Sequence, residues 1–193
     1  MKKQRIEAFS DGVIAIIITI MVLELRAPHG GQWGDLLPLL PAFGSYVLSF
    51  IYIAIYWNNH HHLFQAVERV NGRTLWANVH WLFWLSLMPV ATAWMGENGF
   101  APAPVTGYGL ILLATGLAYS FLTHTLVAHH GSTSRLAKSL GRDRKGKISI
   151  LLYVVGTAVA TMVPWAACLL FALVAVAWFI PDRRIEKALH GHD

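Results

Sequence analysis

The sequence predicts an all-α fold, a polytopic membrane helix bundle of six transmembrane helices without a soluble domain. Of the 193 residues, 55% are hydrophobic and only 13% are charged, whereas about a quarter of the residues in soluble domains are charged. Eight Trp, six Tyr and nine Phe suit aromatic belts at two membrane interfaces. We therefore expect one transmembrane domain over residues 1–193.

Five apolar runs mark the helices. A spanning helix needs about 20 apolar residues, and the first four runs fit one helix each. The fifth run, 148–180, would be about 50 Å long as a single helix. It has Pro164 at its middle, so we expect two short helices joined by a tight turn. The expected helices are 6–25, 38–59, 74–95, 104–129, 147–163 and 165–181.

The distribution of basic residues supports six helices. With both termini on one side, 14 of the 15 Lys and Arg fall on that side and Arg26 alone falls on the other. Cytoplasmic loops carry the excess of Lys and Arg, so both termini are expected in the cytoplasm. Five helices would place Arg183, Arg184 and Lys187 outside, against this rule. Because the basic residues flank membrane segments, the pI near 9.6 does not indicate nucleic-acid binding.

The first apolar segment is expected to be a retained helix. Its basic start and apolar stretch are also features of a secretory signal peptide. However, Glu24 and Arg26 stand where a signal peptide would need small residues for cleavage.

Two polar residues, Ser10 and Asp11, lie at the cytoplasmic end of this first helix. They have the residue types of a helix N-cap, which satisfies free backbone N–H groups. An ionisable group at a membrane boundary is also a candidate for a functional or structural network. The residues alone leave both interpretations open.

One face of the same helix carries bulky apolar residues at successive turns, with one hydroxyl among them. At 100° per residue this face comprises Phe9, Gly12, Ile16, Thr19, Ile20 and Leu23. Such a face is typical of a seam between packed helices. It also fits a pore wall in which rings of Ile and Leu form a constriction that closes by dewetting. Periodicity does not separate these two interpretations.

The run Arg5-Ile6-Glu7-Ala8-Phe9-Ser10-Asp11 matches the signature R-x-x-x-F-S-D. With its apolar continuation, its length and its helix count, the chain resembles bacterial members of the family of the lysosomal potassium channel, transmembrane protein 175. The run Tyr56–Phe64 looks like the end of that family's second helix. The resemblance implies a potassium-preferring cation channel of the bacterial inner membrane, a homotetramer in lipid, with potassium as the permeant ion and without a cofactor.

The resemblance also implies roles for residues of the first helix. The hydrophobic constriction would begin at Ile16 and continue at Ile20 and Leu23, and Thr19 would place a hydroxyl in the pore. The signature residues would form a network that ties this helix to its neighbours and serves gating or assembly, not ion coordination. These signature residues are Arg5, Phe9, Ser10 and Asp11.

Two other motifs suggest different sites. Val105–Gly109 superficially resembles the T-V-G-Y-G filter of potassium channels, but it lacks the intervening Val and opens a helical run. Histidines gather at helix ends, at His60–His62 and at His124, His129 and His130. Boundary histidines of this kind bind iron, haem or zinc in some membrane proteins. No matching set of histidine boxes accompanies them, and the lone Cys168 cannot form a cysteine-based metal site.

A secondary transporter is the remaining alternative. It predicts broken helices at the midplane and paired repeat halves. Pro89 and Pro164 lie within apolar runs, but no internal repeat pairs them. Ionisable residues in the membrane segments are also scarce.

Overall fold

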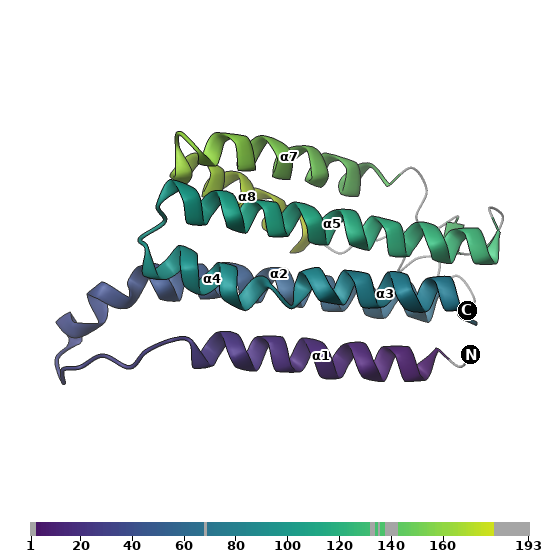
Figure 1. Ribbon diagram of the computed structural model, residues 1–193, viewed down its shortest axis with the longest axis horizontal. Helices are drawn as coiled ribbons and strands as arrows, with labels where there is room; N and C mark the ends of the chain where they lie inside the picture. The colour runs from purple at the N-terminus through teal and green to yellow at the C-terminus, as the bar shows by residue number, and fades with distance from the viewer. Residues whose placement is uncertain (1–2, 68, 132–133, 135, 138–142, 180–193) are drawn as a thin grey trace, which may run out of the picture.

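The computed structural model describes residues 3–67, 69–131, 134, 136–137 and 143–179. These residues form a bundle of helices that lie side by side, run alternately up and down, and turn at two opposite ends (Figure 1). In chain order the helices are α1 (Gln4–Leu23), the 3-10 helix η1 (Trp33–Leu39), α2 (Leu40–Gln65), α3 (Gly72–Leu85), α4 (Met88–Glu97), α5 (Pro102–His130), α7 (Arg144–Ala160) and α8 (Pro164–Phe179). The predicted all-α membrane bundle is confirmed, with η1 continuing into α2 and α3–α4 forming one passage.

Length and surface both suit a membrane. Among the described residues, three segments are long and apolar enough to cross a membrane: Gln4–Leu23, Trp33–Gln65 and Pro102–His130. Helices α7 and α8 have 17 and 16 residues, about 24–26 Å at 1.5 Å per residue, so they are short, as expected from the sequence. The outward side of α8 exposes Leu169, Leu173 and Val176 by 62%, 52% and 64%, an apolar surface that suits lipid.

The third passage is broken, which corrects the expectation of a continuous helix over 74–95. α3 ends at Leu85, and α4 begins at Met88 with Pro89 in its first turn. Proline has no N–H, and its ring clashes with the carbonyl four residues earlier, so the helix cannot run through. The break is closed by a bond from Leu87 N to Trp84 O at 3.2 Å and by Ser86 Oγ, which donates to Phe83 O at 2.7 Å.

The second helix is longer than the expected 38–59, because α2 continues to Gln65. The residues beyond the apolar run are polar, and several of their side chains find partners in the protein. Asn59 Nδ2 donates to Ile55 O at 2.8 Å, and His60 Nε2 lies 2.9 Å from Asn78 Oδ1. These bonds pair part of the polar stretch, whereas His62 Nδ1 is buried without a hydrogen-bond partner among the described residues.

Pro164 separates the last two helices, as the sequence predicts. α7 ends at Ala160, and Pro164 is the first residue of α8, where its fixed φ and missing N–H are tolerated. The turn between them is tight, with Val163 N donating to Val159 O at 2.8 Å. The two helices therefore pack directly against each other.

Basic residues gather at one end of the bundle. The end where α1, α3 and α7 begin carries seven of the described Lys and Arg, and the opposite end carries Arg26 (Figure 1). The seven residues are Lys3, Arg5, Arg69, Arg73, Arg144, Lys145 and Lys147. The other basic residues in the predicted charge pattern lie outside the described residues, namely Lys2, Arg135, Lys138, Arg142, Arg183, Arg184 and Lys187.

Buried hydroxyl groups connect the helices at the centre. Thr92 Oγ1 of α4 donates to Ser49 Oγ of α2 at 2.6 Å, and Ser49 donates onward to Tyr108 Oη of α5 at 3.1 Å. Tyr52 Oη donates to Phe171 O of α8 at 2.7 Å. α2 therefore lies at the centre of the hydrogen-bonded core.

Close packing around Phe171 joins α5, α7 and α8. Phe171 is fully buried, and glycines face it from two helices. A Cβ atom on Gly156 would lie 2.6 Å from Phe171 Cε1, and one on Gly109 would lie 2.8 Å from Phe171 Cζ. Since Cβ atoms do not approach other carbons so closely, both positions require glycine.

We predict that Gly156→Ala destabilises the protein, because the added methyl group overlaps the buried Phe171 ring. Overpacking of this kind costs about 1–3 kcal/mol. Thermal unfolding in detergent measures the effect. Gly72→Ala is the matched control, since nothing lies within 4 Å of a Cβ atom at that helix start. Equal melting temperatures for the two variants would contradict the packing argument.

Candidate pore-lining helix

Helix α1 lies at the edge of the bundle, where it packs against α2, α3 and α4 (Figure 1). One side of α1 is buried against these helices. Its buried residues recur every three or four positions, at Ile6, Ser10, Ile14, Ile17 and Met21. This spacing forms one continuous face, so the seam between α1 and its own chain uses that face.

The face predicted to carry the constriction points the other way. Ile16, Ile20 and Leu23 are 60%, 43% and 75% exposed. Thr19 and Gly12 are exposed as well. The interpretation of this face as a helix–helix seam within the chain is therefore excluded, and its apolar residues are left for lipid or for another copy of the chain.

Thr19 carries the one hydroxyl on this exposed face. Its Oγ1 donates to Ala15 O of the same helix at 2.9 Å. The hydroxyl proton is thus used within the helix, and the oxygen lone pairs stay available as acceptors. A hydroxyl held in this way can accept a hydrogen bond from water or contact a cation.

Ser10 begins a buried chain of hydrogen bonds through three helices. Asn78 Nδ2 of α3 donates to Ser10 Oγ at 2.9 Å, and Asn78 Oδ1 lies 2.9 Å from His60 Nε2 of α2. All three residues are almost completely buried. With the amide oriented toward Ser10, its oxygen accepts from His60, so the imidazole carries its proton on Nε2.

Two aromatic rings pack against the His60 ring. It stacks on Trp81 with centroids 4.9 Å apart and planes at 12°, and its centroid is 4.4 Å from that of Phe64. The sequence drew attention to the histidines but not to Asn78 as a partner. A buried polar residue in an apolar helix was the available signal.

Asp11 joins α2 through a separate contact. Trp57 Nε1 donates to Asp11 Oδ1 at 3.0 Å, and the Trp57 indole stacks on His61 with centroids 6.1 Å apart. Asp11 and Ser10 both lie inside α1, which begins at Gln4. The N-cap interpretation is therefore wrong for both residues, and they contact neighbouring helices instead.

The other two signature residues lie differently. Phe9 is 56% exposed, on the outward face with Ile16. Arg5 is exposed, and within the part of the chain that the structure describes it makes no hydrogen bond or ion pair. The structure thus brings Ser10 and Asp11 into contact with α2 and α3, but not Arg5 and Phe9.

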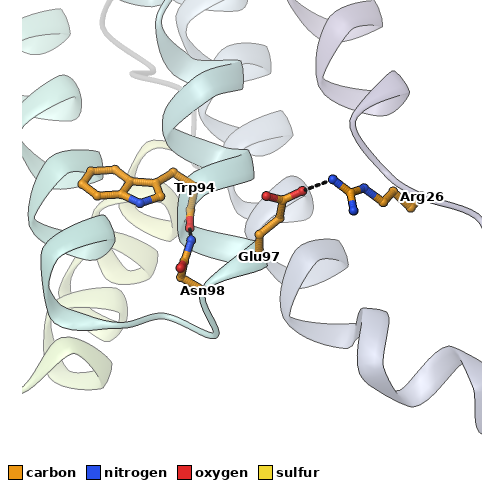
Figure 2. Close-up of polar contacts among 4 residues, drawn as sticks. All are labelled: Arg26, Trp94, Glu97 and Asn98. Carbon is orange, nitrogen blue, oxygen red and sulfur yellow. Dashed lines mark hydrogen bonds and ion pairs between the residues drawn. The ribbon is translucent and has the colours of Figure 1, made fainter.

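Each end of α1 has an additional attachment. At its start, Lys3 Nζ donates to Phe64 O at 2.8 Å, which satisfies a carbonyl in the last turn of α2. Beyond its end, Arg26 forms an ion pair with Glu97 of α4 at 3.0 Å, next to Asn98 (Figure 2). These two side chains are 77% and 50% exposed, so the pair contributes no more than about 1 kcal/mol. Neither attachment is predictable from the sequence alone.

The segment that resembles a potassium-channel filter and the clustered histidines have other surroundings in the structure than those sites would need. Val105–Gly109 lies inside α5, where Tyr108 is bonded to Ser49 and Gly109 packs on Phe171, so this segment is not a filter loop. His129 Nδ1 lies 3.1 Å from Asn71 Nδ2. Among the described residues, no three His, Cys, Asp or Glu side chains lie close enough to share a metal ion.

Comparison with known proteins identifies the family. The family model described as the endosomal/lysosomal potassium channel TMEM175 matches residues 5–89. A potassium channel of Chryseobacterium sp. is 53% identical over 189 residues, which cover 98% of each chain. The chain belongs to the TMEM175 family of potassium channels. The resemblance drawn from the first helix is therefore confirmed.

Other TMEM175 relatives extend the match. A potassium channel of Streptomyces collinus is 36% identical over 126 residues, 61% of each chain. The crystal structure of a lysosomal potassium-selective channel TMEM175 homolog from Chamaesiphon minutus matches with a TM-score of 0.80 and 26% identity, covering 93% of this chain and 97% of that one. These relatives are named as ion channels, not as enzymes.

The matched segment of the TMEM175 model coincides with the contacts around α1. Residues 5–89 hold α1 from its second residue onward and all of α2 and α3. The hydrogen bonds from Asn78 to Ser10 and from Trp57 to Asp11 fall within it. The family signature therefore lies on the helix that these contacts orient.

We predict that Asn78→Leu destabilises the protein by about 1–2 kcal/mol, since His60 and Ser10 would both lose their buried partner. Unfolding in detergent with increasing denaturant measures the change. Asn98→Leu is the control, because Asn98 is exposed and donates only to Trp94 O in its own turn (Figure 2). A loss for Asn78→Leu no larger than for Asn98→Leu would refute the importance of the network.

Proposed function

We propose that this protein is a potassium-preferring monovalent cation channel, with α1 of four identical chains lining one central pore. The observation that carries this proposal is the outward position of Ile16, Ile20 and Leu23. These apolar side chains face away from their own chain, as a pore on the axis of an oligomer requires. The number four comes from the family resemblance.

The proposed gate is a hydrophobic constriction. Four copies each of Ile16, Ile20 and Leu23 would form three apolar rings. Seven residues of helix separate the first ring from the last, a distance of about 10 Å. A narrow apolar passage of this length expels water, so a small rotation or dilation of α1 would open and close it.

Thr19 would provide a polar ring within the constriction. Because its proton is donated to Ala15 O, its oxygen can face a cation that has lost part of its hydration shell. Selectivity would then depend on partial dehydration and on pore diameter. Such a pore favours potassium over sodium because potassium holds its water less strongly.

The buried contacts of α1 would position the gate. Ser10 and Asp11 connect this helix to α2 and α3 through Asn78 and Trp57. Neither residue lies on the face of Ile16, so we assign them to orientation and gating of α1, not to ion coordination.

The charge distribution supports an orientation in the membrane. The end that carries seven described basic residues would face the cytoplasm, because cytoplasmic loops carry the excess of Lys and Arg. Arg26 and Glu97 would then lie at the outer mouth of the pore. The membrane would be the bacterial plasma membrane, and residues 1–193 would act as one channel domain.

The break between α3 and α4 favours a secondary transporter, since transporters use interrupted helices. Recording of single-channel currents in a lipid bilayer discriminates between the two functions. Turnover far above about 10³ ions per second exceeds an ordinary catalytic or transport cycle. Unitary currents at that rate support the channel, and slow saturable flux without them supports the transporter.

We predict that Ile16→Asn changes potassium flux severalfold, with the increase expected from hydration of the closed constriction. Potassium-loaded liposomes containing the purified protein measure the flux. Val22→Asn is the matched control, because Val22 is also exposed on α1, by 44%, but points about 120° away from Ile16. The pore assignment fails if wild type conducts no cation or if Ile16→Asn behaves as wild type does.

We also predict a tetramer. Native mass spectrometry of the detergent-solubilised protein is expected to give four times the chain mass of 21.4 kDa. The purified Ile16→Asn variant should also be a tetramer, since the substitution alters the proposed pore lining and not the attachments of α1. A monomer or dimer as the dominant species would contradict the four-chain pore.

A further inference from the structure

A cavity of about 80 Å³ lies inside each chain between α2, α5 and α7, with α8 closing one side. It is separate from the outward face of α1, because α1 packs against α2, α3 and α4. One ordered water needs about 10–15 Å³, so the space is large enough for a small organic molecule. The lining comes from the half of the bundle where α7 begins and includes Asp143 and Gly146 of its first turn.

Several aromatic rings line this cavity. Tyr56, Tyr119 and Tyr153 line the cavity together with Trp178. The Tyr56 and Tyr119 rings are 5.7 Å apart at 57°, so they present differently oriented faces. Gly116 gives these rings room, because a Cβ atom there would lie 3.3 Å from Tyr153 Cε2 and 3.6 Å from Tyr56 Oη.

The Trp178 wall is held in place. Its Nε1 donates to Ser149 Oγ at 2.8 Å, and Ser149 donates in turn to Lys145 O at 2.9 Å. The orientation of the indole is therefore fixed before any ligand binds, which lowers the entropic cost of binding. Lys145 Nζ lies 5.5 Å from the Trp178 ring centroid, so this ring already attracts an ammonium group.

Among the described residues that line the cavity, only Asp143 has a formally charged side chain. Asp143 also caps α7, since its Oδ1 accepts from Gly146 N at 3.1 Å. It has a left-handed backbone with φ of 36°, which Asn also tolerates. One carboxylate beside several aromatic faces is the arrangement that binds alkylated ammonium ions.

We propose that this cavity binds a small alkylated ammonium ion of the choline type. The methyl groups would contact the rings of Tyr56, Tyr119 and Tyr153, and the positive charge would face Asp143. The hydroxyl groups of Ser120 and Thr123 line the same space and can bond a polar tail. The site does not depend on the proposed ion conduction, because it lies within one chain and away from α1.

Isothermal titration calorimetry of the purified full chain with choline tests the proposal. The neutral isostere 3,3-dimethylbutan-1-ol has the same shape without the charge. Choline is expected to bind roughly tenfold or more tightly than this alcohol, because only the cation gains from the carboxylate and the ring faces. Equal affinities, or no choline binding, would overturn the assignment.

Variants locate the bound cation. Asp143→Asn keeps the helix cap and is expected to weaken choline binding roughly tenfold, whereas Glu7→Gln, which removes a carboxylate outside the cavity, should not weaken it. Lys145→Gln is expected to tighten binding, because it removes a competing positive charge near Trp178. Unchanged affinity in both Asp143→Asn and Lys145→Gln would refute a charged site at this position.

A filled cavity gives an independent test. Ser120→Leu adds bulk inside the space, and its own hydroxyl donates only to Gly116 O of the same helix at 3.0 Å, so it is expected to abolish choline binding. Thr125→Leu is the matched control on the same helix, outside the lining. Loss of binding in Thr19→Ala with retention in Ser120→Leu would place choline in the pore and overturn the proposal.

Discussion

Hydrogen bonds between buried groups of different helices hold this bundle in register. Lipid cannot form hydrogen bonds with a polar group, so each buried polar side chain must find its partner within the protein. Ser49 of α2 is bonded to Thr92 of α4 and to Tyr108 of α5. Tyr52 extends the connection to α8 through Phe171 O. A nonpolar interface would allow helices to slide, whereas each of these bonds is satisfied at one position only. α2 is therefore the helix on which the others are placed.

The first helix depends on the same constraint. Ser10 is bonded through Asn78, which also contacts His60, so α1 can bury only one of its faces against α2 and α3. The opposite face, with Ile16 and Leu23, is consequently turned outward. In the channel that we propose, this outward face lines the pore. The buried polar residues of α1 thus set the direction in which its exposed apolar residues point.

Some features were predictable because local chemistry decides them. The fifth apolar run is too long for one helix and has Pro164 at its middle. A pair of short helices around this proline was therefore expected. Pro89 has the same chemistry, yet a continuous helix was predicted there, since the apolar run gave no sign that α3 would end at Leu85. The extension of α2 to Gln65 was missed as well, because the apolar run ends earlier and the buried partner of His60, Asn78, lies on another helix.

The membrane bundle, the clustering of basic residues at one end and the family follow from the sequence, since these depend on apolar length, on charge order and on a short signature. Which side of α1 is buried depends on how the helices pack in three dimensions. Periodicity places Ile16, Ile20 and Leu23 on one face but cannot tell a seam from a free surface, because lipid, a neighbouring helix and a pore all accept isoleucine. The cavity around Asp143 was equally hidden, since Tyr56, Tyr119 and Trp178 lie on three different helices and meet only when those helices pack.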